Sequence, residues 1–91
     1  MNPNSKFNLG QTVITATAMK LLSSQDIDSA LRRHASGDWG NVCEEDQISN
    51  EEALIEGFRL VSVYESHDKI TFWIITEADR SSTTVLLPSN Y

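Results

Sequence analysis

The sequence contains a single cysteine, Cys43, so no disulfide can form within the chain. A lone thiol is typical of a reducing compartment, and we expect a cytoplasmic protein. Basic residues are also scarce, since seven Lys and Arg stand against thirteen Asp and Glu, giving a formal net charge of −6. Binding to nucleic acid or to anionic lipid requires clustered cations. The composition therefore argues against direct contact with either.

Long apolar segments are absent as well. The longest nearly unbroken apolar run, residues 72–75, is far shorter than the ~20 residues that a membrane-spanning helix needs. No apolar stretch follows residues 1–6 directly, so we do not expect a signal peptide there. We expect residues 1–6 to form a flexible arm and residues 7–91 to form one domain, because a chain of this length supports only one compact core.

The first two thirds of the chain show helix signals after one short strand. β-branched residues predict a strand at 11–15, and Thr15 or Thr17 can cap a short helix that follows it. A second helix is expected from Ser24, with acids in its first turn and bases in its last, as the helix dipole favours. Gly37 is suited to end that helix in a left-handed conformation.

A third, shorter helix is expected over residues 51–56. Ser49 or Asn50 can cap it, and Gly57 follows it. The segment from Cys43 to Gly57, which contains this helix, is rich in acidic residues and has no Lys or Arg.

The last third of the chain predicts three strands, at residues 58–64, 69–76 and 83–87. Both faces of the middle segment are apolar, which predicts a central strand with Phe72 and Trp73 on opposite faces and both largely buried. The predicted fold is therefore an α+β domain, with two or three short helices packed on a three- to four-stranded, mostly antiparallel sheet.

The most distinctive polar cluster lies at residues 32–40. His34 ends a predicted helix and could move protons near neutral pH, and Asp38 could orient it. The alternative is structural, because cations suit a helix C-terminus and the turn that follows can bury Trp39. His34, Asp38 and Cys43 match no known zinc spacing, so we expect no metal and no cofactor.

A second polar cluster, at residues 76–84, joins two predicted strands. Glu77 and Asp79 could act as bases, and Arg80 could stabilise an anionic transition state. The alternative is an ordinary polar turn that Asp79 nucleates.

The acidic segment at residues 44–56 is the third candidate site. Its ordinary interpretation is a solvated face, and its functional interpretation is a surface that docks a basic partner protein. The residues that we predict to bind this partner are all acidic: Glu44, Glu45, Asp46, Glu51 and Glu52.

Two motif blocks carry a family resemblance. The sequence Arg-His-x-x-Gly-Asp-Trp-Gly at residues 33–40 and the sequence Ile-Thr-Glu-Ala-Asp-Arg-Ser-x-Thr-Thr at residues 75–84 resemble a family of small uncharacterised proteins of bacterial genomes, plasmids and phages. The resemblance runs from about residue 7 to Tyr91. It implies an accessory protein of a mobile genetic element or bacterial genome, with no assigned activity.

A more remote likeness concerns the order of the polar residues, which is similar to that in small nuclease domains of the barnase/EndoU/colicin/RelE group. That likeness implies metal-free RNA cleavage, with His34 as the acid/base, Arg59 and Arg80 as phosphate clamps, and Thr76 as a substrate contact. The net charge of −6 departs from the group, because an RNA-binding surface needs exposed bases.

Two functions follow as hypotheses. The first is a binding protein that regulates or inhibits a host-defence or nucleic-acid enzyme through its acidic segment. The second is a small endoribonuclease. The charge favours the first, and the two polar clusters favour the second.

Overall fold

The computed structural model describes residues 5–91, which form an α+β fold. Its four-stranded sheet has the order β1-β4-β3-β2, and β1 (Gln11–Ile14) runs parallel to β4 (Ser82–Leu86). β2 (Leu60–Glu65) and β3 (Thr71–Thr76) form an antiparallel hairpin, and β3 pairs antiparallel with β4. The predicted fold class is confirmed, with one parallel pair in an otherwise antiparallel sheet.

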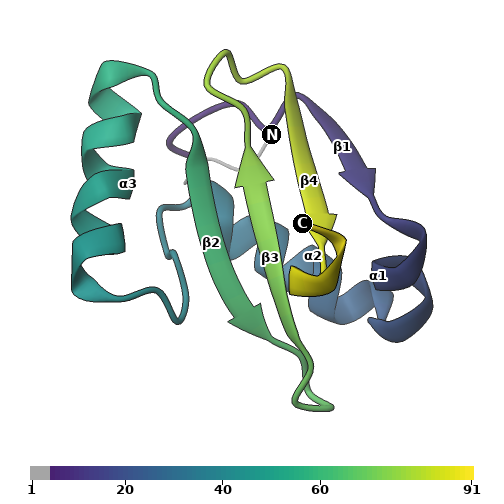
Figure 1. Ribbon diagram of the computed structural model, residues 1–91. Helices are drawn as coiled ribbons and strands as arrows, with labels where there is room; N and C mark the ends of the chain where they lie inside the picture. Colours follow the sequence, from purple (N-terminus) through teal and green to yellow (C-terminus); the bar gives the residue numbers. More distant parts are fainter. Residues whose placement is uncertain (1–4) are drawn as a thin grey trace.

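The helices lie on one face and at one edge of the sheet (Figure 1). α1 (Ala16–Leu21) and α2 (Ser24–Ala35) cover one face, and α3 (Glu44–Glu56) lies beside the edge strand β2. A 3₁₀ turn, η1 (Pro88–Asn90), contacts β3 from the opposite face. Within residues 5–91, no helix has both the length and the apolar character that crossing a membrane requires.

The ends of α1 and α2 follow the sequence signals. The Thr15 hydroxyl caps α1, and the Ser23 hydroxyl caps α2, each accepting a hydrogen bond from a first-turn N–H. Residues 1–4 of the predicted arm lie outside the described residues, and the Lys6 N–H donates to the Ala35 carbonyl at the end of α2.

α3 begins at Glu44, seven residues before the predicted start of the third helix. Three acids occupy its first turn, where the positive end of the helix dipole stabilises them. The expected cap at Ser49 or Asn50 is therefore wrong, because both residues lie inside the helix. Gly57 ends it with φ of 80°, as predicted.

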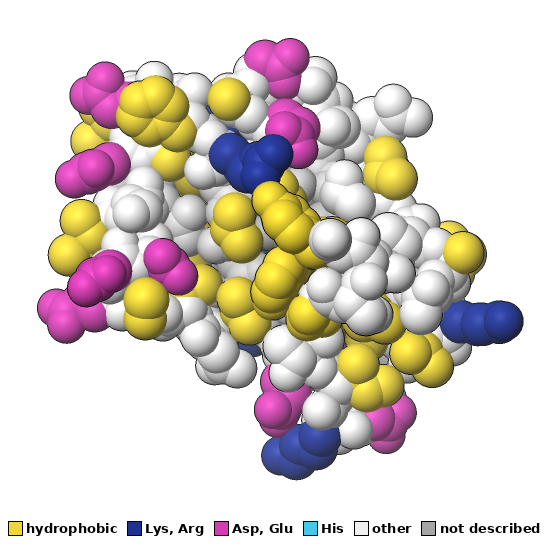
Figure 2. All heavy atoms as spheres, viewed as in Figure 1, with side chains coloured by type: hydrophobic (Ala, Val, Ile, Leu, Met, Phe, Trp, Pro, Cys, Tyr) yellow, Lys and Arg dark blue, Asp and Glu magenta, His cyan; other side chains and the backbone are white. Residues whose placement is uncertain are grey.

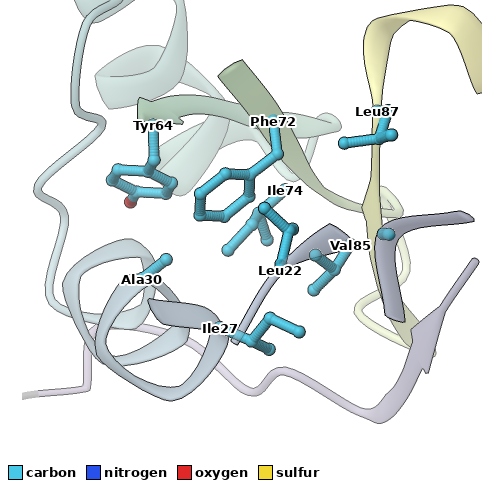
Figure 3. Close-up of a cluster of buried hydrophobic side chains, with 9 residues drawn as sticks. Leu22, Ile27, Ala30, Tyr64, Phe72, Ile74, Val85 and Leu87 are labelled. Carbon is cyan, nitrogen blue, oxygen red and sulfur yellow. The ribbon is translucent and has the colours of Figure 1, made fainter. Parts of the chain in front are cut away.

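The main core lies between the sheet and the first two helices. Figure 3 shows Tyr64, Phe72 and Val85 pointing from the strands toward Ile27 and Ala30 of α2. All five side chains are buried. This apolar contact holds α2 against the sheet, because most helix stability in proteins comes from packing of one face.

The prediction for the central strand is confirmed for its position and for Phe72. β3 lies between β2 and β4, and Phe72 is 1% exposed. Trp73, on the opposite face of the strand, is intermediate in burial and so less covered than Phe72. Within residues 5–91, no α-helix covers its face of the sheet, where the Tyr91 ring contacts Trp73 edge-on at 5.6 Å between centroids.

The outer edge of β2 is closed by groups from outside the sheet. The Asn50 side-chain amide of α3 donates to the Val61 carbonyl (2.8 Å) and accepts from the Val61 N–H (3.1 Å). Next along the strand, the Val63 carbonyl accepts from the Asn41 N–H, and the Val63 N–H donates to the Trp39 carbonyl. α3 and the segment before it therefore occupy the positions that a fifth strand would take.

We expect Asn50→Ala to lower the free energy of unfolding by about 1–3 kcal/mol, because it leaves two backbone groups of Val61 without partners. Chemical denaturation would measure the change. Ser49→Ala, at the exposed neighbouring position, is the control and should change the free energy by less than ~0.5 kcal/mol. Equal effects of the two substitutions would contradict the role assigned to Asn50.

Candidate functional site

His34 lies at the end of α2 with both ring nitrogens hydrogen-bonded. Its Nδ1 is 2.5 Å from Ser62 Oγ on β2, and its Nε2 is 2.9 Å from Thr76 Oγ1 on β3. Thr76 Oγ1 is 2.7 Å from Thr83 Oγ1 on β4, which donates to the Leu9 carbonyl at 2.6 Å. One continuous chain of hydrogen bonds therefore joins α2 to three strands and to the segment before β1.

Each hydroxyl has one proton to donate, and this sets the donor direction along the chain of hydrogen bonds. Because the Thr83 hydroxyl donates its one proton to Leu9, Thr76 must donate to Thr83. Thr76 then accepts from Nε2–H of His34, so this nitrogen carries a proton. In the neutral imidazole Nδ1 carries no proton and accepts from the Ser62 hydroxyl.

Burial keeps the imidazole of His34 neutral. The residue is 0% exposed, and Phe7 and Trp39 pack edge-on against its ring at centroid distances of 5.2 and 5.7 Å. Burial, with a smaller contribution from the positive charge of Arg80, lowers the His34 pKa from 6.5 to about 3. A histidine that is buried and doubly bonded cannot reach a substrate, so the geometry favours a structural role.

Asp38 contacts Arg33 rather than His34. Its carboxylate accepts from Arg33 Nε at 2.8 Å and from the Gly40 N–H at 3.2 Å, so it holds the turn. The guanidinium of Arg33 is the main cause that lowers the Asp38 pKa. Tyr64 donates to the Asp38 carbonyl at 2.5 Å, and Gly40 has φ of 75° where any Cβ would overlap Val63.

Arg80 and Arg59 are both engaged in contacts within the chain. Arg80 donates to the carbonyls of Ala53 (2.9 Å) and Phe58 (2.6 Å), so it supplies the cation at the C-terminal end of α3. Arg59 donates to Tyr91 Oη at 2.9 Å and lies 3.7 Å from Glu77. These contacts place Arg59 with Tyr91 on the face of the sheet opposite α2.

The structure therefore brings together two of the four residues of the nuclease hypothesis. His34 and Thr76 are in direct contact, and both are buried. Arg59 lies on the face of the sheet opposite α2, and Arg80 donates hydrogen bonds to the C-terminal end of α3. His34, Asp38 and Cys43 form no metal-binding group among residues 5–91.

α3 carries all of the protein's net charge. It contains six of the thirteen acidic residues and no base, so the remaining seven acids balance the seven Lys and Arg elsewhere. All six acids are exposed, and none forms an ion pair with a residue in the described range. Outside α3, acids pair with nearby bases, as Asp28 does with Arg32 and Glu65 with Lys69.

Apolar side chains are exposed among these acids. Ile48 and Ile55, one heptad apart on α3, are 54% and 83% exposed. They line a shallow groove between α3 and the 37–39 turn, together with Glu51 and Glu52. Figure 2 shows hydrophobic and acidic side chains side by side over α3, at the left of the molecule.

Comparison with protein-family models, with curated proteins and with solved structures finds no match for this chain.

Sequence reasoning missed two groups that matter here. Strand alternation puts Ser62 on the same face as Leu60 and Tyr64, and a serine among buried apolar residues indicates a hydrogen-bond partner inside the core. Its partner, His34, is 28 residues away in the sequence. Ile48 was outside the helix predicted for this region, so its exposure on a helical face could not be seen.

The two histidines should give opposite pH dependences. His34, whose pKa is lower in the fold, stabilises fully above pH 6.5 and loses its contribution as the pH falls toward 3. Asp26 at 2.6 Å raises the pKa of exposed His67, whose contribution is full below pH 6.5 and is lost as the pH rises through the raised pKa.

Between pH 6.5 and 4.5 we expect the free energy of unfolding to fall by up to ~1.4 kcal/mol per pH unit because of His34. Denaturant titrations at each pH would measure it. His34→Gln should remove this slope, whereas His67→Asn should leave it in place. A slope unchanged in His34→Gln would show that His34 is not the responsible group.

Proposed function

We propose that this protein acts by binding a basic surface of a partner protein through α3. The observation that carries the proposal is the concentration of the whole net charge of −6 on one exposed helix. The helix dipole favours the three acids of the first turn, but stability does not account for those in the second half of α3, because like charges four residues apart on a helix are destabilising. Glu52 and Glu56 form such a pair, and they lie toward the negative end of the helix dipole.

The contacts of α3 leave this face available. The helix is held from its inner side by Asn50, Ala53 and the guanidinium of Arg80. Among its side chains, only Asn50 and Ala53 are buried. A partner can therefore approach the acidic side without displacing a contact within residues 5–91.

The acidic and apolar residues together suit long basic side chains. Lysine and arginine have apolar stems and charged heads, so a stem can pack on Ile48 or Ile55 while the head reaches Glu51 or Glu52. An interface of this kind has apolar anchors inside a charged rim.

The charge spacing favours a partner that normally binds nucleic acid. Residues 44–56 span about 18 Å at 1.5 Å per residue, so the six acids average roughly one charge per 3 Å along the helix. A nucleic-acid strand carries one phosphate per ~3.4 Å. The resemblance to plasmid and phage proteins supports the same class of partner, an enzyme of host defence or of nucleic-acid metabolism that the protein inhibits or regulates.

Neutralising the acids of α3 should weaken binding more than neutralising as many acids elsewhere. The test variant carries Glu44→Gln, Glu45→Gln, Glu51→Gln and Glu52→Gln, and the control carries Asp28→Asn, Glu65→Gln, Asp68→Asn and Asp79→Asn. Both lower the magnitude of the net charge equally.

Fluorescence anisotropy with a labelled helical peptide of Lys and Leu would measure binding. Four surface ion pairs, each worth ~0.2–1 kcal/mol, total ~0.8–4 kcal/mol and predict a loss of roughly fourfold to several hundredfold for the α3 variant. The control should lose less than threefold, and affinity of the unaltered protein should fall with added salt. Equal losses in both variants would show that net charge alone drives binding and would contradict the proposal.

The nuclease hypothesis has a direct test of its own. We expect purified protein incubated with total RNA and a metal chelator to leave the RNA intact, since His34 is buried and neutral. Gel electrophoresis beside the His34→Gln variant would show the result. Cleavage that resists chelator and disappears in the variant would replace the binding proposal with an enzymatic one.

A further inference from the structure

The two edge strands of the sheet differ in whether their outer backbone groups have hydrogen-bond partners. The β2 edge is closed by Asn50 and by the backbone of residues 39–41. The β1 edge lies at the other side of the sheet, and Figure 1 shows no element beyond it. An open edge pairs readily with another strand, so the sheet formed within residues 5–91 can be extended at β1 but not at β2.

Backbone N–H and C=O groups point alternately to the two sides of β1, and this alternation identifies the groups that do not pair with β4. The N–H groups of Gln11 and Thr15 donate to the carbonyls of Ser81 and Val85, so odd-numbered residues of β1 direct their backbone groups toward β4. Thr12 and Ile14 then direct theirs outward. Among residues 5–91, no hydrogen bond reaches these outward groups from outside the β1–β4 pair.

Apolar side chains accompany this edge. Val13 on β1 is 43% exposed, and Met19 and Leu21 on α1 are 63% and 49% exposed. A groove between α1 and α2 opens beside β1, with Ile14, Met19 and Leu31 among its lining residues. An apolar surface next to unpaired backbone groups is typical of a strand-pairing interface.

The charge distribution favours a second copy of this chain as the occupant. The first 25 residues contain no acid, and their only charged side chains are Lys6 and Lys20. The charge of −6 lies on α3, at the opposite edge of the sheet. Two copies joined at β1 would place their β2 strands about 34 Å apart, at ~4.8 Å per strand spacing. That distance exceeds the Debye length of ~8 Å severalfold, so the two acidic helices would not repel.

We propose that the protein forms a two-fold symmetric dimer through antiparallel pairing of β1 with β1 of a second copy. The outward groups of Thr12 and Ile14 set the register: each Thr12 exchanges two backbone hydrogen bonds with Ile14 of the other copy. Val13 then faces its own counterpart at the two-fold axis as a non-hydrogen-bonded pair. The product is a continuous sheet of eight strands, with α3 exposed at each end.

Sedimentation equilibrium of the full chain should give twice the chain mass. Val13→Lys places two like charges directly opposite each other across the axis and should weaken the dimer at least tenfold. Thr71→Lys, at an exposed position of β3 away from the interface, is the matched control and should leave the dimer unchanged. A monomeric mass for the unaltered protein at millimolar concentration would overturn the proposal, as would a dimer that persists in Val13→Lys.

Disulfide cross-linking tests the register itself. In a background with Cys43→Ser, Val13→Cys should oxidise rapidly to a covalent dimer, because a non-hydrogen-bonded antiparallel pair has its Cα atoms ~4.5 Å apart. Gln11→Cys is the control, since its partner in this register is residue 15 and not residue 11. Equal cross-linking at both positions would overturn the proposed register. Neither experiment depends on binding through α3, so failure here leaves the proposed function standing.

Discussion

The uncharged state of His34 is the constraint on which the rest of the structure depends. Its two nitrogens need one donor and one acceptor, and Ser62 and Thr76 supply them from adjacent strands. The hydrogen bonds continue from Thr76 through Thr83 to the Leu9 carbonyl, so the segment before β1 belongs to the same network. Elsewhere the core between helices and sheet is apolar, and contacts without direction cannot by themselves fix how α2 sits along the strands.

α3 follows a different physical logic. It has no continuous apolar face to bury, and of its apolar side chains only Ala53 is buried, in a small cluster with Trp39 and Leu60. The rest of the attachment consists of hydrogen bonds to backbone groups: Asn50 of α3 bonds to the edge of β2, and Arg80 bonds to the C-terminal end of α3. Because little apolar area is needed to hold the helix, most of its surface remains free for carboxylates and for Ile48 and Ile55. The residues that attach α3 to the domain are therefore different from those that its outer surface exposes.

Much of the fold could be predicted from the sequence, because strand alternation and helix capping are local signals. The strands, the cap of α1, the start of α2 at Ser24 and the central place of β3 all follow from residues close together in the chain. The roles of Asn50 and Arg80 could not be predicted, since each contacts backbone groups more than ten residues away. The polar cluster around His34 was visible as a motif, but only burial decides between catalysis and structure.

The separation of charge along the sheet also makes the molecule a strong electric dipole. The charges outside α3 sum to zero, whereas α3 carries six negative charges at one edge of the sheet. The longest extent of the molecule is 34 Å. In the field of a positively charged surface, such a molecule rotates before it makes contact. On an anion-exchange resin or a cationic electrode, it would therefore adsorb in one orientation, with α3 against the surface and the edge of β1 directed into solution.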